Sequence, residues 1–128
     1  VWQMHGAGAI GGLTLVGLPM LRRLLDTLGA SAAVWPFGTG WRELTEADIE
    51  PLSAVVVEVW PALYEAKRGV SAEGVKEYKT QAQVRAAAEA FARMDDAGDL
   101  QKAFAPPAGA DEALIAQVED EEGWILGV

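Results

Sequence analysis

AVVVEVW (residues 54–60) is the strongest strand signal in this chain. Its valines are β-branched and favour extended backbone, and an unbroken run of them is typical of a strand buried on both faces of a parallel sheet. Pro61 ends the run, because proline has no N–H for a ladder hydrogen bond. The stretch predicts an α/β fold with helices covering the sheet, and it places one carboxylate, that of Glu58, inside the strand.

The residues before this strand predict one helix, one further strand and a short turn of helix. The first helix is expected to begin near Pro19 and to end at Gly29, since proline suits a first helical turn and glycine a helix end. Its inner face would carry Leu18, Leu21, Leu25 and Leu28. Residues 32–37 are interpreted as a buried strand stopped by Pro36, and residues 45–48 as the start of a short helix.

The residues after it predict a loop and two more helices. Residues 66–79 are charged and contain glycines, which favours a surface loop. Thr80 followed by Gln83 has the pattern of a capping box, and the helix that follows would bury the stripe Val84, Ala87, Ala88 and Phe91. A last helix is expected from Asp111 to about Glu119, and a terminal strand over residues 123–128.

This order of elements predicts an α/β domain with a few-stranded, partly parallel sheet flanked by helices. The length of 128 residues fits one domain. Two strong strands make a thin sheet, and the chain begins at Val1 without a methionine. We therefore expect residues 1–128 to be the C-terminal part of a longer α/β domain.

Composition restricts the chemistry and the partners. The formal charge is −9, from nineteen Asp and Glu against ten Lys and Arg, so the surface repels phosphates at long range. This counts against a free-standing nucleic-acid binder, although it leaves open a nuclease with a local groove. There is no cysteine and only one histidine, so a metal would have to be a hard ion held by carboxylates. No segment predicts a membrane span or a signal peptide, and a cytoplasmic setting is expected.

A glycine run near the start fits the dinucleotide-binding fingerprint G-x-G-x-x-G, with Gly6, Gly8 and Gly11 in the three positions. The fingerprint also needs a preceding strand and an acidic residue at the end of a second strand. Only five residues precede Gly6, and Asp26 stands at the right distance but in a helical segment. A dinucleotide-binding oxidoreductase is therefore kept as an alternative. The competing interpretation of the same residues is a tight turn in which His5 hydrogen-bonds the backbone.

Six short motifs follow one another in an order that resembles a known family. They are WQMHGAGAIGG (2–12), LVGLP (15–19), AVWPF (33–37), VEVWPALY (57–64), AQVR (82–85) and EEGWILG (121–127). Together they resemble the C-terminal half of a family of bacterial proteins classed as predicted nucleases of the ribonuclease H-like fold. Members of this family are often labelled as cobalamin or molybdopterin-cofactor biosynthesis proteins.

The resemblance implies a metal site made of carboxylates, with Mg²⁺ or Mn²⁺ as the ion. Glu58 corresponds to the glutamate before the family's proline-ended strand, and Asp111 resembles the acidic start of its last helix. Both are therefore candidate catalytic residues and metal ligands. The family's first strand, which carries an essential aspartate, would precede Val1. Thr80 stands at a position where members of the family tend to have aspartate.

Each candidate also has a structural explanation. Glu58 can be partly solvated at the strand end or paired with Arg85, and Asp111 can act only as a helix cap. Residues 119–122 would be a solvated acidic face. Stacking on a nucleic-acid base is a possible role of Trp41, which is expected to be exposed. A non-catalytic interaction or assembly module, forming a homo-oligomer, is the main alternative to the nuclease.

Overall fold

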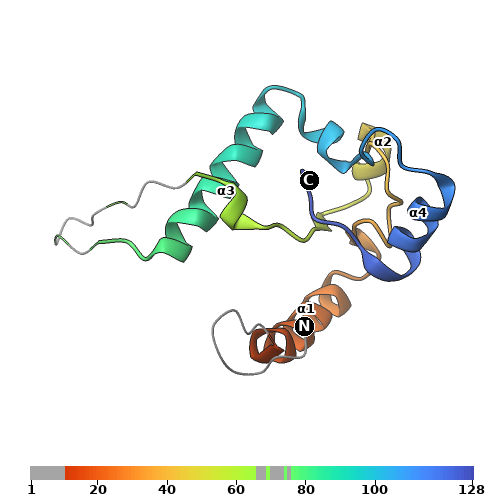
Figure 1. Cartoon of the computed structure of the whole chain (residues 1–128). Helices are drawn as coiled ribbons and strands as arrows, with labels where there is room; N and C mark the ends of the chain where they lie inside the picture. Colours follow the sequence, from red (N-terminus) through yellow and green to blue (C-terminus); the bar gives the residue numbers. More distant parts are fainter. Residues whose placement is uncertain (1–10, 66–68, 70–73, 75) are drawn as a thin grey trace.

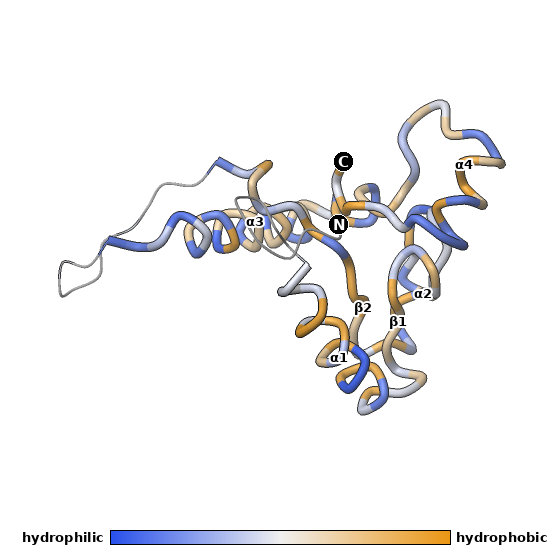
Figure 2. The backbone as a smooth tube through the Cα atoms, turned by 60° about the horizontal axis from the view of Figure 1, so that its bottom comes forward, coloured by the Kyte–Doolittle hydropathy of each residue, from blue (hydrophilic) through white to orange (hydrophobic). Residues whose placement is uncertain are grey.

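The computed structural model describes residues 11–65, 69, 74 and 76–128 (Figure 1). The elements are, in chain order, α1 (Gly11–Leu28), a 3-10 turn (Gly29–Ser31), β1 (Ala32–Val34), α2 (Glu46–Ile49), β2 (Ala54–Val56), a 3-10 turn (Pro61–Leu63), α3 (Lys79–Asp96), a 3-10 turn (Leu100–Phe104), α4 (Glu112–Gln117) and a π-helical turn (Val118–Glu122). The predicted α/β class is confirmed. The sheet, α2, α4 and the C-terminal segment form one group, from which α1 and α3 extend in different directions (Figures 1 and 2).

The sheet has two parallel strands, with Ala33 of β1 opposite Val55 of β2. β1 is shorter than the strand predicted over residues 32–37. After Val34 the chain turns, with the N–H of Gly38 donating to the carbonyl of Val34 at 2.6 Å. Pro36 has no N–H with which to continue the ladder, which is why the strand ends before it.

β2 is also shorter than the strand predicted over residues 54–60. Its three residues are half-buried, so the expected burial on both faces is wrong. In the described residues the sheet has two strands, and Val55 of β2 packs against the core, as does Val57 just after the strand. The other face of the sheet is only half-buried. Further along, Glu58 forms a single parallel bridge with Ile125. The terminal strand predicted over residues 123–128 is reduced to this bridge, because the chain turns immediately after it.

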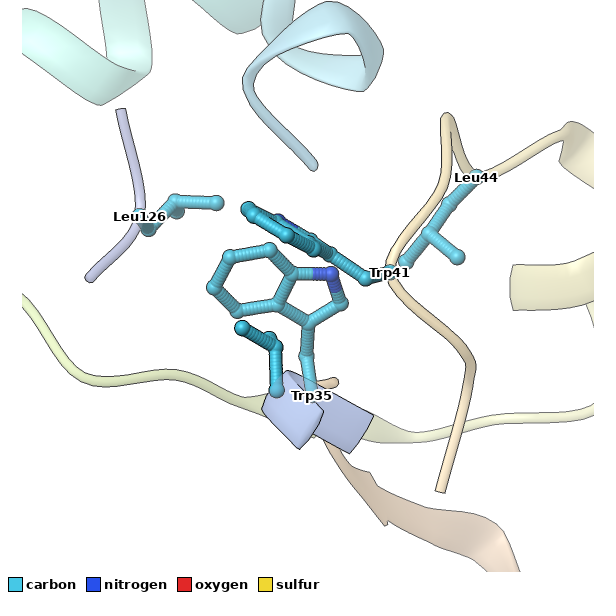
Figure 3. Close-up of a cluster of buried hydrophobic side chains, with 5 residues drawn as sticks. Trp35, Trp41, Leu44 and Leu126 are labelled. Carbon is cyan, nitrogen blue, oxygen red and sulfur yellow. The ribbon is translucent and has the colours of Figure 1, made fainter. Parts of the chain in front are cut away.

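The core is small and rich in tryptophan. Its fully buried members are Trp35, Trp41, Leu44, Val118 and Leu126. The indoles of Trp35 and Trp41 lie against each other, and Leu126 reaches them from the C-terminal segment (Figure 3). Trp41 is only 2% exposed, and its ring centroid lies 4.6 Å from that of Trp124. The base-stacking role left open for Trp41 is therefore excluded, because its indole is enclosed by the core.

α1 starts earlier than predicted. It begins at Gly11 and passes through Pro19, so the expected start at Gly17-Leu18-Pro19 is wrong. Pro19 removes one helical hydrogen bond but does not end the helix, which continues to the predicted end at Gly29, where φ is +56°. Leu21, Leu25 and Leu28 are half-buried as expected, whereas Leu18 is exposed.

α3 starts one residue before the predicted cap. The N-cap is Tyr78, whose N–H donates to the Gln81 side chain at 3.2 Å, and Thr80 lies inside the helix. The buried residues of the helix are Ala82, Ala86 and Ala87, while Val84 and Ala88 are exposed. The predicted stripe is therefore confirmed for Ala87 and for Phe91, which is half-buried against the core, and is wrong for Val84 and Ala88. The loop predicted over residues 66–79 falls largely outside the described residues.

The two remaining helices agree with prediction. α2 occupies the segment predicted over residues 45–48, with Thr45 as its N-cap. α4 follows Asp111, and the π-helical turn continues it toward the predicted end near Glu119. None of the helices in the described part combines the length and apolar character that a membrane span needs.

Candidate functional site

An open hollow of about 460 Å³ lies where the C-terminal segment passes the end of β2. It is lined by Glu58, Leu114, Gln117, Val118, Glu122, Gly123, Trp124, Ile125 and Val128. Two acidic residues, Glu58 and Glu122, therefore line one hollow with an otherwise mainly apolar wall. In open α/β sheets, ligands bind outside the carboxyl ends of the strands, which is where this hollow lies.

Glu58 is positioned by the extended backbone after β2. Side chains alternate along this segment: Val57 and Val59 are half-buried, whereas Glu58 and Trp60 are exposed. The prediction that Glu58 lies inside a strand buried on both faces is therefore wrong, because the strand ends at Val56 and Glu58 is exposed at the edge of the hollow. The explanation of a partly solvated group at the strand end fits this position.

The proposed ion pair between Glu58 and Arg85 is not formed. Arg85 lies on α3, where its guanidinium pairs with Glu77 at 2.9 Å and with Glu89 at 3.1 Å. The Glu77 hydrogen bond, followed by that of Glu89, raises the pKa of Arg85 above its usual range. These two partners hold the guanidinium on the surface of α3, so the charge of Glu58 is not neutralised by it.

Glu122 reaches the hollow because the chain reverses immediately after it. Gly123 has φ of +68°, a conformation that favours glycine. A Cβ at this position would lie 3.1 Å from Cζ of Phe37, so a side chain would require the ring to shift. The reversal sends residues 124–126 along the segment that carries Glu58, where the N–H of Leu126 donates to the carbonyl of Glu58 at 2.9 Å.

The acidic run at residues 119–122 is divided between two environments. Glu119 is half-buried, and its carboxylate accepts a hydrogen bond from the N–H of Trp41 at 2.6 Å. Glu119 thus anchors the π-helical turn to the loop that carries the core tryptophan. Asp120 and Glu121 are exposed, while Glu122 is exposed and lines the hollow. The prediction of a uniformly solvated acidic face is wrong for Glu119, since its carboxylate accepts a hydrogen bond from the backbone of Trp41.

Asp111 serves as the N-cap of α4. Its Oδ1 accepts a hydrogen bond from the N–H of Leu114 at 2.8 Å, which satisfies one of the free donors at the helix start. Leu114 lines the hollow, but Asp111 is not among the lining residues. The structure therefore does not bring Glu58 and Asp111 together as two walls of this hollow, and the metal-binding role of Asp111 stays a prediction.

The donor set available for a metal is small. Within residues 11–65, 69, 74 and 76–128, no group of three or more His, Asp or Glu side chains is arranged to hold an ion. Mg²⁺ commonly keeps several waters and binds through one or two carboxylates together with substrate phosphates. The pair of carboxylates facing the hollow fits that mode of binding, and it does not fit an ion enclosed by protein ligands.

The glycine fingerprint can be followed only in part. His5, Gly6 and Gly8 lie outside the described residues, and Gly11 is the first residue of α1. Asp26 lies on α1, as its leucine-rich surroundings predicted, and pairs with Arg22 at 2.9 Å. A helical, ion-paired Asp26 does not fit the acidic residue of the fingerprint, which ends a strand.

Sequence reasoning missed Glu122 as a lining residue. The signal was present in Glu122-Gly123, because a glycine that follows a helical run often reverses the chain. What the sequence did not reveal is the segment that the reversed chain meets.

No protein-family model, curated protein or solved structure matches this chain. The resemblance to the ribonuclease H-like nucleases therefore stays a prediction, and function is argued from the hollow itself.

Proposed function

We propose that this chain carries part of the active site of a metal-dependent nuclease with a ribonuclease H-like fold, in which Glu58 and Glu122 bind the ion. The observation that carries the proposal is the pairing of these two carboxylates in one open hollow at the carboxyl end of a parallel strand. Hard divalent cations prefer oxygen ligands, and the lining supplies no sulfur or imidazole ligand.

The role of the two carboxylates would be to hold Mg²⁺ or Mn²⁺ at the mouth of the hollow, where a phosphodiester can approach from solvent. A bound ion of this kind neutralises charge on the phosphate and generates a nucleophile from water. The apolar wall, including Leu114 and Ile125, would limit the access of bulk water to one side of the ion. Electrostatic interactions with the phosphate are stronger where water is excluded.

The ribonuclease H-like sheet is part of the same proposal. In the described part, β2 pairs on one side only, with β1. Further strands of a larger sheet would pair at its other edge, and the helices that flank such a sheet would cover the open face of β2. Parallel sheets are stable when both faces are covered, which a two-stranded sheet does not achieve.

Binding of Mn²⁺, followed by electron paramagnetic resonance of the free ion, tests the proposed site. We expect Glu58→Gln and Glu122→Gln each to weaken binding by at least about tenfold, since outer partners of metal ligands alone account for losses of that size. Glu121→Gln is the matched control, because Glu121 is the neighbour of Glu122 and does not line the hollow. Equal affinities for the wild-type protein and Glu58→Gln would overturn the assignment.

A second candidate function, assembly with another copy of this chain, is favoured by the exposed face of α1. Val16, Met20 and Leu24 follow one another at helical spacing and are 69%, 60% and 50% exposed. Figure 2 shows the hydrophobic colouring along this helix. The stripe is symmetrical about Met20, so an antiparallel, two-fold contact would place Val16 against Leu24 of the other copy.

Light scattering at increasing protein concentration tests this second candidate. We expect a dimer that Met20→Glu converts to a monomer, because the contact would place two charges at its centre. Leu63→Glu is the control, since Leu63 is 50% exposed and lies far from α1 in sequence. A wild-type protein that remains monomeric at high concentration would exclude this candidate.

A further inference from the structure

We propose that the exposed indole of Trp60 stacks on a base of a short, single-stranded nucleic acid whose phosphate binds the metal ion proposed at Glu58. The inference deepens the proposed nuclease function and rests on it. It starts from the unusual exposure of Trp60, which is 54% exposed, while Trp35 and Trp41 are each 2% exposed. Trp124 is half-buried and donates its indole N–H to the carbonyl of Val128.

Trp60 and Glu58 lie on the same side of the chain. The exposure of residues 57–60 alternates, and Trp60 has the extended conformation with φ of −102° and ψ of 90°. Alternate residues of an extended chain project to the same side, at a spacing of roughly 7 Å along the backbone. A short strand can therefore place one phosphate on an ion held by Glu58 and a neighbouring base against the indole.

The backbone at Trp60 is held in place. Pro61 begins a 3-10 turn, and the N–H of Leu63 donates to the carbonyl of Trp60 at 3.1 Å. On its other side, the segment is fixed by the hydrogen bond from Leu126 to Glu58. A platform for stacking gains affinity from this rigidity, because less conformational entropy is lost on binding.

The charges near the site limit the length of the ligand. The residues that line the hollow include two carboxylates and neither Lys nor Arg. The formal charge of the whole chain is −9, so a long polyanion would be repelled. Bases inside a duplex are already stacked on one another, so an aromatic platform of this kind favours a single strand.

The experiment is a titration of the whole chain with tetrathymidylate in the presence of Mg²⁺, followed by tryptophan fluorescence. We expect quenching in the wild-type protein and affinity that is roughly 5- to 150-fold weaker in Trp60→Ala, the range that loss of one stacked base produces. Trp60→Phe should keep part of the affinity, measured by competition against a labelled strand. Leu63→Ala is the control, because Leu63 is also exposed but is the last residue of the 3-10 turn.

Three results would overturn the inference: no binding of tetrathymidylate by the wild-type protein, equal affinity in Trp60→Ala, or equal affinity for a blunt duplex. These outcomes are separate from the fate of the proposed function, which depends on Mn²⁺ binding by Glu58 and Glu122. A protein that binds Mn²⁺ through these carboxylates but binds the strand equally well without Trp60 would keep the metal site and lose the stacking platform.

Discussion

The backbone N–H of Leu126 donates a hydrogen bond to the carbonyl oxygen of Glu58, over a distance of 2.9 Å. This bond joins the C-terminal segment to the extended chain after β2, and Glu58 and Glu122 meet at one hollow because of it. The side chain of Leu126 is buried in the tryptophan core, so the segment that lines the hollow is joined directly to that core.

Gly123→Ala should destabilise the protein by about 1–3 kcal/mol, since a side chain at positive φ is strained and its Cβ would make a tight contact with Phe37. Urea unfolding followed by circular dichroism measures the change. The control is Gly12→Ala, which adds a Cβ on α1 with nothing within 4 Å and should be neutral or slightly stabilising. An unchanged free energy of unfolding in Gly123→Ala would mean that the chain does not reverse through this conformation.

Two substitutions at Asp111 separate its capping role from a role in metal binding. Asp111→Ala removes the acceptor for the N–H of Leu114 and should cost about 1 kcal/mol of stability. Asp111→Asn keeps a capping oxygen but removes the charge, so its stability should be close to that of the wild type. If Asp111→Asn also leaves the Mn²⁺ affinity unchanged, Asp111 is a helix cap only. A loss of Mn²⁺ affinity without a loss of stability would show that Asp111 is a metal ligand.

Trp41 and Trp60 should differ sharply in their contribution to stability. Trp41→Ala empties the centre of the core and is expected to cost about 3–5 kcal/mol. Trp60→Ala removes a side chain that is largely in solvent, and its cost should stay within about 0.5 kcal/mol. Chemical denaturation of the two variants under the same conditions checks the difference, and similar losses would contradict the assignment of Trp60 to the surface.

The wild-type protein should be more stable than Asp48→Asn, by an amount that depends on pH. Its carboxylate accepts hydrogen bonds from the Arg42 guanidinium at 2.6 and 2.8 Å and from Thr45, and these bonds hold the pKa of Asp48 well below its usual range. A lowered pKa in the folded state stabilises the protein above the unfolded-state pKa of about 4. The difference in stability between wild type and Asp48→Asn should be constant from neutral pH to about 5 and should decline below about 4. Thermal unfolding across this range measures it, and a difference that grows on acidification would contradict the account.

Local signals predicted the α/β class and several helix ends. Thr45 begins α2, Asp111 caps α4 and Gly29 ends α1, and each can be recognised because capping depends on a few neighbouring residues. The start of α1 was missed because Pro19 is compatible with a first turn, and nothing local indicated that the helix continues upstream.

Strand length and burial could not be predicted in the same way. A valine run indicates extended backbone, but the end of β2 at Val56 depends on where its partner β1 turns away. The same limit applies to the site. Glu58 could be singled out from its position among valines, whereas Glu122 lines the hollow only because Gly123 returns the chain to β2, which is a long-range contact.

Paramagnetic line broadening by Mn²⁺ in the amide NMR spectrum tests the central claim most directly, because it locates the ion without depending on turnover. The account predicts that the signals of Glu58 and of residues 122–125 broaden first, together with the indole N–H of Trp124. It also predicts that Glu58→Gln removes this pattern while Glu121→Gln retains it. Broadening that begins at Asp95 and Asp96, or that spreads evenly over all exposed carboxylates, would contradict a metal site in this hollow.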